Sequence, residues 1–383
     1  MVEWKKLGEI CTYYRGVTYN KKQEVSLGSG GTKILRANNI TLDSNTLNFD
    51  DIKEVSSDVK IKDYQWLNPN DILICAGSGS KEHVGKVAFI FDRIGYAYGG
   101  FMGKLVVSEG LQSRFLFHVI CSHLFKKYLE VALNSTTINN LNAEIVNNFQ
   151  IPIPSLSEQT RIVGILDTFT ASIENLKQQI AQRRKQYEHY RDQLLDLEGK
   201  EGVDGLVLDE ICDVINGRAY KQEELLNEGK YRVLRVGNFF SNDSWYYSNL
   251  ELEEKYYCEK GDLLYAWSAS FGPHIWEGEK TIYHYHIWKM ICKQELNKKF
   301  MYYWLQSENM RKQAFSHLHG ATMAHLTKAL MESLVIPVPS LSEQQRIVSI
   351  LDTFEASIAN LEQQLAQRER QYEYYRNKLL TFE

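Results

Sequence analysis

Hydrophobic residues follow a regular helical pattern through most of two long stretches of this chain, at residues 151–195 and 336–380, beginning after Ser157 and Ser342. The two stretches are identical at about 33 of 45 aligned positions, so the chain consists of two halves that each end in the same segment. In both copies apolar residues recur in alternating steps of three and four over five heptads, which is typical of a coiled coil. Each helix is predicted to be roughly 60 Å long, at about 1.5 Å per residue.

The two heptad positions of the predicted seam carry aliphatic and aromatic side chains, with an arginine at one shared position. These seam residues are Leu166, Phe169, Ile173, Leu176, Ile180, Arg183, Tyr187, Tyr190 and Leu194 in the first copy, and Leu351, Phe354, Ile358, Leu361, Leu365, Arg368, Tyr372, Tyr375 and Leu379 in the second. Because the copies present nearly the same face, we expect them to form an antiparallel intramolecular coiled coil with pseudo-twofold symmetry. A solvent-bridging linker helix, or a helix buried in a larger core, is the alternative.

The start of each helix is predicted from the Ile-Pro-x-Pro run that precedes it. This run is extended, because proline disfavours the helical conformation of the residue before it. Ser157 and Ser342 are the predicted N-caps, and Gln345 follows Ser342 by three residues, as in a capping box.

The remaining segments contain short β-like runs separated by turn residues. In the first segment these runs are Lys33–Arg36, Asp71–Cys75 and Lys86–Phe91, and Phe115–Leu133 has helical spacing. The second segment repeats this plan more faintly, with DEICDVING answering to GEICTYYRG and RVLRVGN to KILRANN. The predicted fold class is therefore α+β, with mixed α/β domains at residues 1–150 and 199–335, each followed by a long helix at residues 151–198 and 336–383.

Composition and motifs exclude several classes of protein. The formal net charge of −4 would not by itself suggest DNA binding. No run of about 18 apolar residues and no signal peptide is present, so we expect a cytoplasmic protein with no membrane partner. The chain has no Pro-Pro pair for an adenine methyltransferase loop and no Walker phosphate loop, so it cannot perform methylation or ATP-driven motion by itself.

Histidines and tryptophans of the second segment are candidates for further sites. His284 and His286 would point to one face of a strand, with His274 nearby in sequence, but no further zinc ligand has suitable spacing. We therefore expect no metal. Most of the tryptophans are expected in the core, namely Trp245, Trp267, Trp276, Trp288 and Trp304.

Four sequence features together resemble the specificity (S) subunit of type I restriction-modification systems. They are the IPxPSLSEQxRIVxILD start of each long helix, the R-G-x-T run at Arg15–Thr18, the paired L-R-x-x-N motifs, and G-A-T-x-x-H-L-T-K at Gly320–Lys328. The resemblance covers essentially the whole chain. One departure is Tyr19, where many members of the family have proline.

This resemblance implies a DNA-binding subunit without catalytic residues. Each globular segment would be a target recognition domain for one half of a bipartite site in double-stranded DNA. The helices would separate these domains and dock two methyltransferase (M) subunits, which methylate adenine with S-adenosylmethionine, and restriction (R) subunits, which use ATP and Mg²⁺, would join. The chain itself would bind no cofactor.

Polar side chains of the predicted loops and strand ends are the candidate DNA-binding residues, because Arg, Asn, Ser, Thr and His match the donor and acceptor patterns of base edges. They are Arg15, Arg36, Asn38, Asn39, Ser78, Ser80, Lys81, Thr136, Thr137 and Asn139 in the first domain, and Arg218, Arg235, Asn238, Ser268, Ser270, His274, Thr322 and His325 in the second. For each of them, turn chemistry or strand-end capping is the competing explanation.

Two further functions stay open from the sequence. The chain could be a non-catalytic coiled-coil scaffold that binds proteins, which co-purification with a methyltransferase would distinguish. It could also be the specificity subunit of a related restriction enzyme with another catalytic partner, which the activity of that partner would distinguish.

Overall fold

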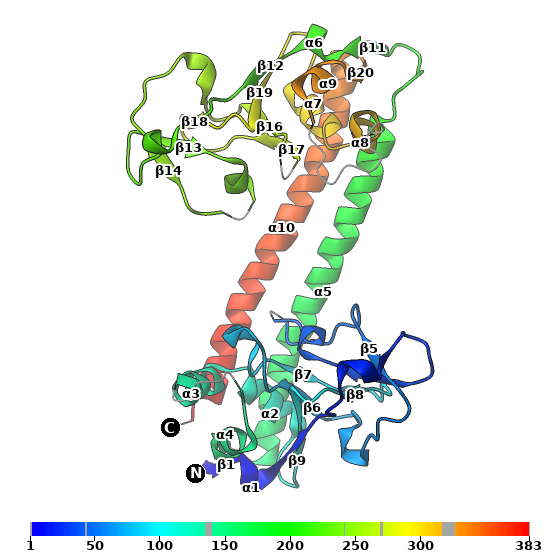
Figure 1. The fold of residues 1–383 in the computed structure, drawn as a ribbon, viewed down its shortest axis with the longest axis vertical. Helices are drawn as coiled ribbons and strands as arrows, with labels where there is room; N and C mark the ends of the chain where they lie inside the picture. Colours follow the sequence, from blue (N-terminus) through cyan, green and yellow to red (C-terminus); the bar gives the residue numbers. More distant parts are fainter. Residues whose placement is uncertain are drawn as a thin grey trace. The chain divides into compact units, whose positions relative to one another are not determined.

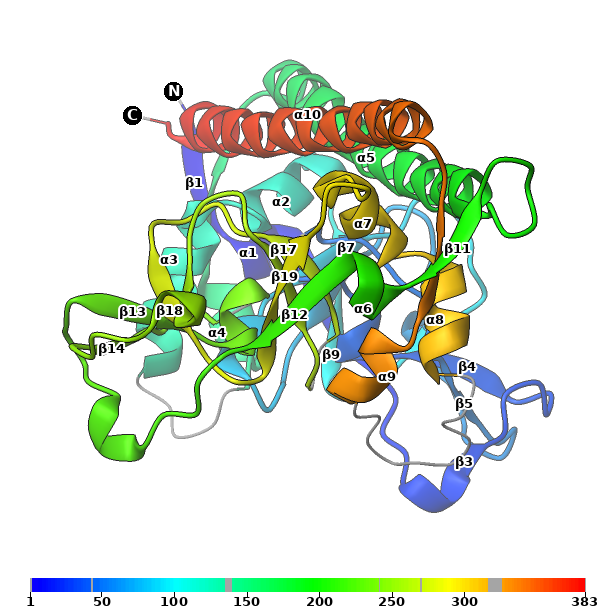
Figure 2. The ribbon, with the colours of Figure 1, turned by 90° about the horizontal axis from the view of Figure 1, so that it is seen from above.

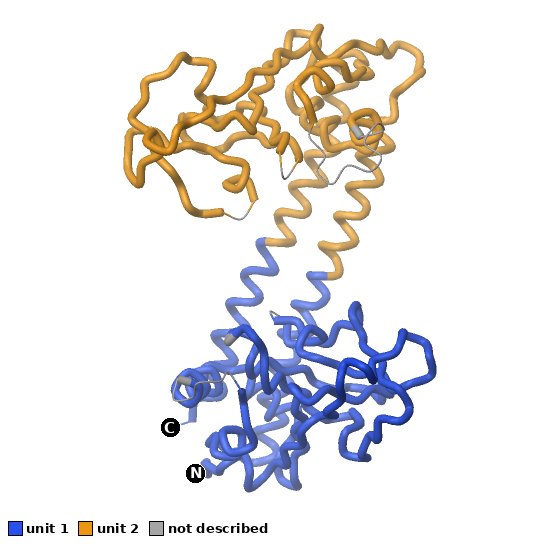
Figure 3. Tube along the Cα trace, in the orientation of Figure 1, with its two compact units in different colours: residues 1–177, 363–383 blue, residues 178–362 orange. Residues whose placement is uncertain are grey.

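The computed structural model describes residues 2–42, 44–134, 140–240, 242–268, 271–315 and 326–382. The chain divides into two compact units, residues 1–177 with 363–383 (unit 1) and residues 178–362 (unit 2) (Figures 1 and 3). Each unit holds one globular domain and one part of each long helix. No helix in these described ranges has the length and apolar character needed to span a membrane.

The first domain consists of two four-stranded sheets and a two-stranded ribbon. One sheet has the order β2-β9-β6-β7 and is antiparallel, and the other has the order β3-β5-β4-β8, in which β4 and β8 are parallel. The ribbon pairs β1 with β10 and so joins the two ends of the domain. The strands are Glu3–Lys6 (β1), Cys11–Arg15 (β2), Glu24–Val25 (β3), Thr32–Leu35 (β4), Lys53–Val55 (β5), Ile72–Cys75 (β6), Val87–Phe89 (β7), Ala97–Tyr98 (β8), Met102–Val107 (β9) and Gln150–Ile153 (β10).

Four short helices accompany these strands: Leu7–Ile10 (α1), Ser113–Ile120 (α2), His123–Asn134 (α3) and Ala143–Asn148 (α4). The helical spacing predicted over Phe115–Leu133 is confirmed, but it is divided between α2 and α3 because the chain breaks at Cys121 and Ser122. The Ser122 hydroxyl donates to the carbonyl of Val119 (2.6 Å) and accepts from the Leu124 amide (3.3 Å). It thus ends one helix and begins the next, as serine side chains often do at helix termini.

The second domain repeats the topology of the first. Its sheets have the orders β12-β19-β16-β17 and β14-β13-β18-β15, with β13 and β18 parallel, and its ribbon pairs β11 with β20. Figure 2 shows α7 beside β17 and β19. The elements are Asp204–Val207 (β11), Leu208–Ile211 (α6), Cys212–Asn216 (β12), Tyr231–Leu234 (β13), Tyr246–Ser248 (β14), Tyr257–Cys258 (β15), Leu263–Ala266 (β16), Gly272–Ile275 (β17), Thr281–Tyr283 (β18), Ile287–Cys292 (β19), Lys298–Trp304 (α7), Glu308–Phe315 (α8), Lys328–Glu332 (α9) and Val335–Val338 (β20). The faint sequence repeat between the domains therefore corresponds to a shared fold.

An ion pair occupies the same place in both domains, buried in the first and half-buried in the second. Lys104 on β9 lies 3.0 Å from Asp71 and donates to the Trp66 carbonyl, and Lys289 on β19 lies 2.7 Å from Asp262. Because each lysine has both a carboxylate and a carbonyl as partners, the charge is compensated inside the domain. These contacts tie the first sheet of each domain to the neighbouring loop.

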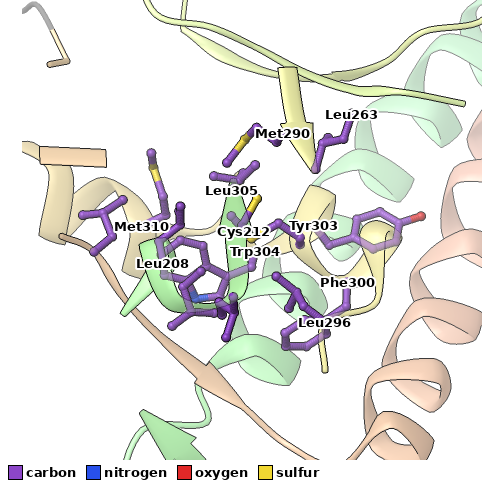
Figure 4. Packing of buried hydrophobic residues seen from close by; sticks show 14 of the residues in the cluster. Leu208, Cys212, Leu263, Met290, Leu296, Phe300, Tyr303, Trp304, Leu305 and Met310 are labelled. Carbon is purple, nitrogen blue, oxygen red and sulfur yellow. The ribbon is translucent and has the colours of Figure 1, made fainter. Parts of the chain in front are cut away.

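Each domain packs its core against both long helices, Leu156–Leu195 (α5) and Leu341–Leu380 (α10). In unit 1 the core includes Leu166 of α5 and Leu380 of α10, both fully buried. In unit 2 it includes Leu195 and Leu351, together with the domain residues shown in Figure 4. Trp288 and Trp304 belong to this core, and the partly buried Trp245, Trp267 and Trp276 pack against buried clusters, as predicted.

The predicted N-caps of the long helices are wrong by two residues. The helices begin at Leu156 and Leu341, and the cap hydroxyls are those of Ser155 and Ser340, which accept from the amides of Glu158 and Glu343 at 3.4 Å. The reason is that the extended Ile-Pro-x-Pro run ends with its second proline, so the next residue is already the cap.

Contacts between α5 and α10 run antiparallel within each unit, because later residues of α5 meet earlier residues of α10. Examples are Phe169 with Tyr375 and Lys177 with Glu369 in unit 1, and Arg184 with Glu362 and Tyr190 with Phe354 in unit 2. The shared arginine of the heptad pattern packs on an aromatic ring of the other helix, Arg183 on Phe354 and Arg368 on Phe169.

Burial along the predicted seam is uneven. Leu176 and Ile180 are 9% and 8% exposed, whereas Tyr190 and Tyr375 are 45% and 40% exposed although they stack on the other helix. Tyr187 and Tyr372 face the domains. The Tyr372 hydroxyl is hydrogen-bonded to His118 of α2, and the ring of Tyr187 packs edge-to-face against Tyr303 of α7. The pattern therefore combines helix pairing in the middle with attachment of the domains near the ends.

Candidate nucleic-acid interface

An open cavity of about 1650 Å³ lies on the first domain. Most of its lining comes from four segments: the end of β2 up to Lys21, the loop after β4, the loop after β6, and the turn between β8 and β9. Glu24 and Asn140 add to the lining from two other segments. Strand ends from both sheets therefore converge here. Four of the predicted DNA-binding residues line it together, Arg15, Arg36, Asn38 and Ser78.

Arg36 is held in a fixed orientation by an acidic neighbour. Its Nη2 lies 2.6 Å from a carboxylate oxygen of Asp51, which also accepts from Asn38 Nδ2 at 3.1 Å. The Arg36 side chain is 31% exposed and its Nε is buried without a partner. The buried Nε is not accessible to a ligand, but the partly exposed side chain lines the cavity, where a guanidinium can contact a base or a phosphate.

Arg15 is positioned by two acceptors at the cavity wall. Its Nε donates to the carbonyl of Gly100 (3.2 Å) and its Nη2 donates to Oδ1 of Asn140 (3.2 Å). Ser78 lies on the opposite loop, where its hydroxyl accepts from the amide of Ser80 at 3.4 Å. Ser80 itself is half-buried and is not among the lining residues.

Asn39 was predicted to contact DNA, and the structure contradicts this prediction. Its side chain is fully buried, accepts from the Arg36 amide (2.9 Å) and donates to the carbonyls of Asn48 and Asp51. Asn238 makes the same kind of contacts with the Arg235 amide and nearby carbonyls. The L-R-x-x-N motif is therefore a turn motif, in which asparagine fixes the loop that carries the arginine.

The predicted residues of the second domain are more varied in their surroundings. Arg218 binds Glu224 through two hydrogen bonds of 2.9 and 2.7 Å, and these bonds lower the Glu224 pKa to about 2. Arg235 is exposed and packs on the ring of Tyr246, 5.2 Å away. Ser268 is half-buried in the loop after β16.

Histidines of this domain differ from the prediction. His274 on β17 stacks on Phe239 with ring centroids 4.0 Å apart, and burial lowers its pKa to about 4, so packing accounts for its position. His284 and His286 do not lie on a strand, because β18 ends at Tyr283 and they form the turn before β19. Among the residues that the structure describes, no three His, Cys, Asp or Glu side chains form a group suited to a metal ion.

Some predicted residues lie outside the described part of the chain. They are Thr136, Thr137, Asn139, Ser270, Thr322, His325 and the side chain of Lys81.

Other lining residues were missed by the sequence analysis, notably Thr18, Tyr19, Asn48, Phe101 and Asn140. Phe101 is 73% exposed in spite of its apolar ring. The pair Gly99-Gly100 between two apolar runs is a turn signal that could have placed Phe101 at a loop tip.

Comparisons with known proteins all find similarity to specificity subunits of type I restriction enzymes. A family model described as the type I restriction modification DNA specificity domain matches residues 1–183 and 201–370. A putative type I restriction enzyme specificity subunit of Haemophilus influenzae is 27% identical over 409 residues, which cover 100% of this chain and 96% of the relative. The EcoKI specificity subunit of Escherichia coli K12 is 31% identical over 187 residues, which cover 49% of this chain and 40% of the relative.

Solved structures are similar in fold. The S subunit of a type I restriction-modification system from M. genitalium has a TM-score of 0.56 at 17% identity, over 100% of this chain and 97% of that chain. A chain from a structural study of complex assembly in a type I restriction-modification system has a TM-score of 0.62 at 18% identity, over 99% and 96% of the two chains.

Proposed function

The chain belongs to the family of type I restriction-modification DNA specificity proteins, and from this premise we propose that each globular domain binds one half of a bipartite DNA site. The shared topology of the two domains supports two equivalent binding modes. Their different side chains at equivalent positions, such as Arg15 and Asn216 at the ends of β2 and β12, support two different half-sites.

The observation that carries this proposal is the cavity of the first domain, where side chains from four segments converge. Arg15 and Arg36 are both held by hydrogen bonds at its wall, and Asn38 and Ser78 add donors and acceptors. Such side chains match the patterns of base edges in the major groove, and their fixed orientation favours specific contacts over purely electrostatic binding.

For the long helices we propose an antiparallel coiled coil that relates the halves by pseudo-twofold symmetry. Antiparallel contacts within each unit support this pairing. A rigid pair of helices would hold the two domains about one DNA turn apart, ~34 to 36 Å, as paired half-site binders require. We further propose that the helices dock two methyltransferase subunits, with which restriction subunits assemble.

The proposed chemistry lies in the partner subunits. S-adenosylmethionine would be used by the methyltransferase subunits, and ATP and Mg²⁺ by the restriction subunits, while this chain recognises the DNA and performs no reaction. Because we propose that this chain binds DNA, we also propose a cytoplasmic location.

Arg36→Ala and Arg235→Ala test whether each domain recognises its own half-site. The two arginines occupy equivalent positions, because each belongs to the L-R-x-x-N motif of its domain. The full chain with its methyltransferase partner would be given DNA with both half-sites randomised, and bound sequences would be counted. If an arginine contacts guanine through two hydrogen bonds, alanine should cost about 1 to 3 kcal/mol and relax one base of one half-site. If it contacts a phosphate, alanine weakens binding to all sequences. The slope of the logarithm of the binding constant against the logarithm of salt concentration then decreases in magnitude by about one.

Arg93→Ala is the matched control, because Arg93 is exposed on the first domain and does not line the cavity. It should leave the selected sequences unchanged. Relaxation of both half-sites by a single substitution would contradict separate recognition by the two domains.

A further inference from the structure

The turn between β8 and β9 in the first domain has a counterpart between β18 and β19 in the second. In each case three residues connect the strands, Gly99-Gly100-Phe101 in one and His284-Tyr285-His286 in the other. The flanking strand registers agree, because Arg15 pairs with Gly103 where Asn216 pairs with Trp288. The two turns are therefore equivalent in place but unrelated in side chains.

Equivalent backbone hydrogen bonds fix both turns to the strands and loops around them. In the first domain the amide-to-carbonyl bonds are Gly16 to Met102, Val17 to Tyr98, Gly99 to Leu35, Met102 to Gly99 and Ala76 to Phe101. In the second they are Gly217 to Ile287, Arg218 to Tyr283, His284 to Leu234, Ile287 to His284 and Trp267 to His286. The backbone is thus fixed in the same way while the side chains vary.

Glycine is required where the preceding strand crosses this turn. A Cβ on Gly16 would lie 2.2 Å from the Gly99 carbonyl oxygen, and one on Gly217 would lie 2.4 Å from the His284 carbonyl oxygen. No side chain fits at such distances. The glycine shared by GEICTYYRG and DEICDVING is therefore explained by close approach to the turn.

Phe101 projects from this fixed turn into the cavity of the first domain. It is 73% exposed and lines the cavity together with Arg15 and Ser78, and its ring lies against Gly77, where an added Cβ would be 3.2 Å away. An exposed phenylalanine on a rigid backbone within a polar cavity gains little in the free protein. Burial of its ring in a complex would be favourable.

We propose that Phe101 packs against the C5 methyl group of a thymine in the first half-site, so that this turn determines one base of the sequence recognised. The inference rests on the proposed function. The thymine methyl group is the apolar feature that base pairs display in the major groove, and phenylalanine is among the side chains that contact it. In the second domain the equivalent turn offers imidazole and phenol groups, so its base contact has a different chemistry.

Uracil substitution tests this contact directly, because uracil lacks only the methyl group. The full chain with its methyltransferase partner would bind duplexes in which each thymine of the first half-site, on either strand, is replaced in turn by uracil. One replacement should weaken binding by about fourfold, the effect of one buried methyl group. Phe101→Ala should weaken binding to the thymine duplex to a similar degree and remove the sensitivity to uracil.

Phe91→Ala is the matched control, since Phe91 is 66% exposed on the same domain but does not line the cavity. It should retain the full uracil effect. A first half-site without thymine, a wild-type complex insensitive to uracil at every position, or a uracil effect that persists in Phe101→Ala would overturn the contact. If the wild-type complex selects no bipartite site at all, the proposed function fails instead.

Discussion

Gln159 and Gln344 show how one residue can join a long helix to its domain. Gln159 is fully buried, accepts from the Gln112 amide (2.8 Å) and donates to the carbonyls of Gly110 and Pro154. Gln344 makes the equivalent contacts with the Asn297 amide and with the carbonyls of Glu295 and Pro339. Each buried glutamine satisfies three backbone groups where the long helix meets its domain, and this accounts for the Ser-Glu-Gln run in both copies.

Gln159→Ala should destabilise unit 1, because it removes three hydrogen bonds made by a fully buried side chain, one of them to the buried Pro154 carbonyl. The expected loss in the free energy of unfolding is about 1 to 3 kcal/mol. Gln182→Ala, at an exposed position of the same helix, is the control and should stay within about 0.5 kcal/mol of the wild type. Urea unfolding measures both, and equal stability of the two variants would contradict the role of Gln159.

At the scale of elements, pairing of α5 with α10 depends on few buried positions. Ile180 is 8% exposed and adjoins the exposed Ala181. Ile180→Asp should therefore cost about 3 kcal/mol or more and weaken assembly with the methyltransferase subunits, whereas Ala181→Asp adds the same charge to solvent. Ile173→Asp and Leu361→Asp, at half-buried positions, should have smaller effects. Gel filtration measures the assembly, and circular dichroism measures the helix content. Equal results for Ile180→Asp and Ala181→Asp would contradict the pairing of α5 with α10.

The helix α2 attaches the first domain to the long helices through a buried histidine. His118 lies 2.8 Å from Asp167 of α5 and 3.2 Å from the Tyr372 hydroxyl of α10, and Arg114 also binds Asp167. Burial lowers the His118 pKa, although the hydrogen bond that the imidazole donates to Asp167 opposes this, and the nearby Arg114 and Arg376 lower it further. His118 is therefore neutral in the folded protein at neutral pH.

This depressed pKa predicts a pH dependence of stability. The unfolded protein takes up a proton at His118 near pH 6.5, whereas the folded protein does so only at lower pH. The stability present above pH 6.5 should therefore be lost progressively as pH falls toward the folded-state pKa. Between pH 7 and pH 5 the wild type should lose more stability than His118→Gln. His189→Gln, at an exposed position of α5, should behave as the wild type does.

At the scale of the whole molecule, the first domain requires the end of a long helix from the other half of the chain. Tyr372, Leu379 and Leu380 of α10 pack on its core. The corresponding positions of α5 are Tyr187, Leu194 and Leu195, which have the same side chains. A second copy of α5 can therefore replace α10.

A chain that ends after Glu198 should accordingly dimerise at micromolar concentration, with each α5 covering the partner's core. An antiparallel homodimer is symmetric, so with methyltransferase subunits it should methylate an interrupted palindrome made of the first half-site and its inverse. Sedimentation and mapping of methylated adenines measure the two consequences. A folded monomer would contradict the exchange of helices.

The sequence by itself determined the features that arise from local and repeated patterns. The heptad repeat specified two long helices, the Ile-Pro-x-Pro runs specified where they begin to within two residues, and the faint repeat between the domains specified a shared fold. These predictions succeed because periodicity, proline geometry and duplicated segments act through residues close in sequence.

Only the tertiary structure decided which polar residues face the cavity. Asn38 and Asn39 are neighbours in the same motif, yet one lines the cavity and the other is buried beneath it. Phe101 looks like a core residue in the sequence, but the turn of Gly99 and Gly100 places it in the open. The difference between the two asparagines depends on packing between segments distant in sequence, and no local pattern contains that information, whereas for Phe101 the Gly-Gly pair signals a turn but not the cavity that the turn faces.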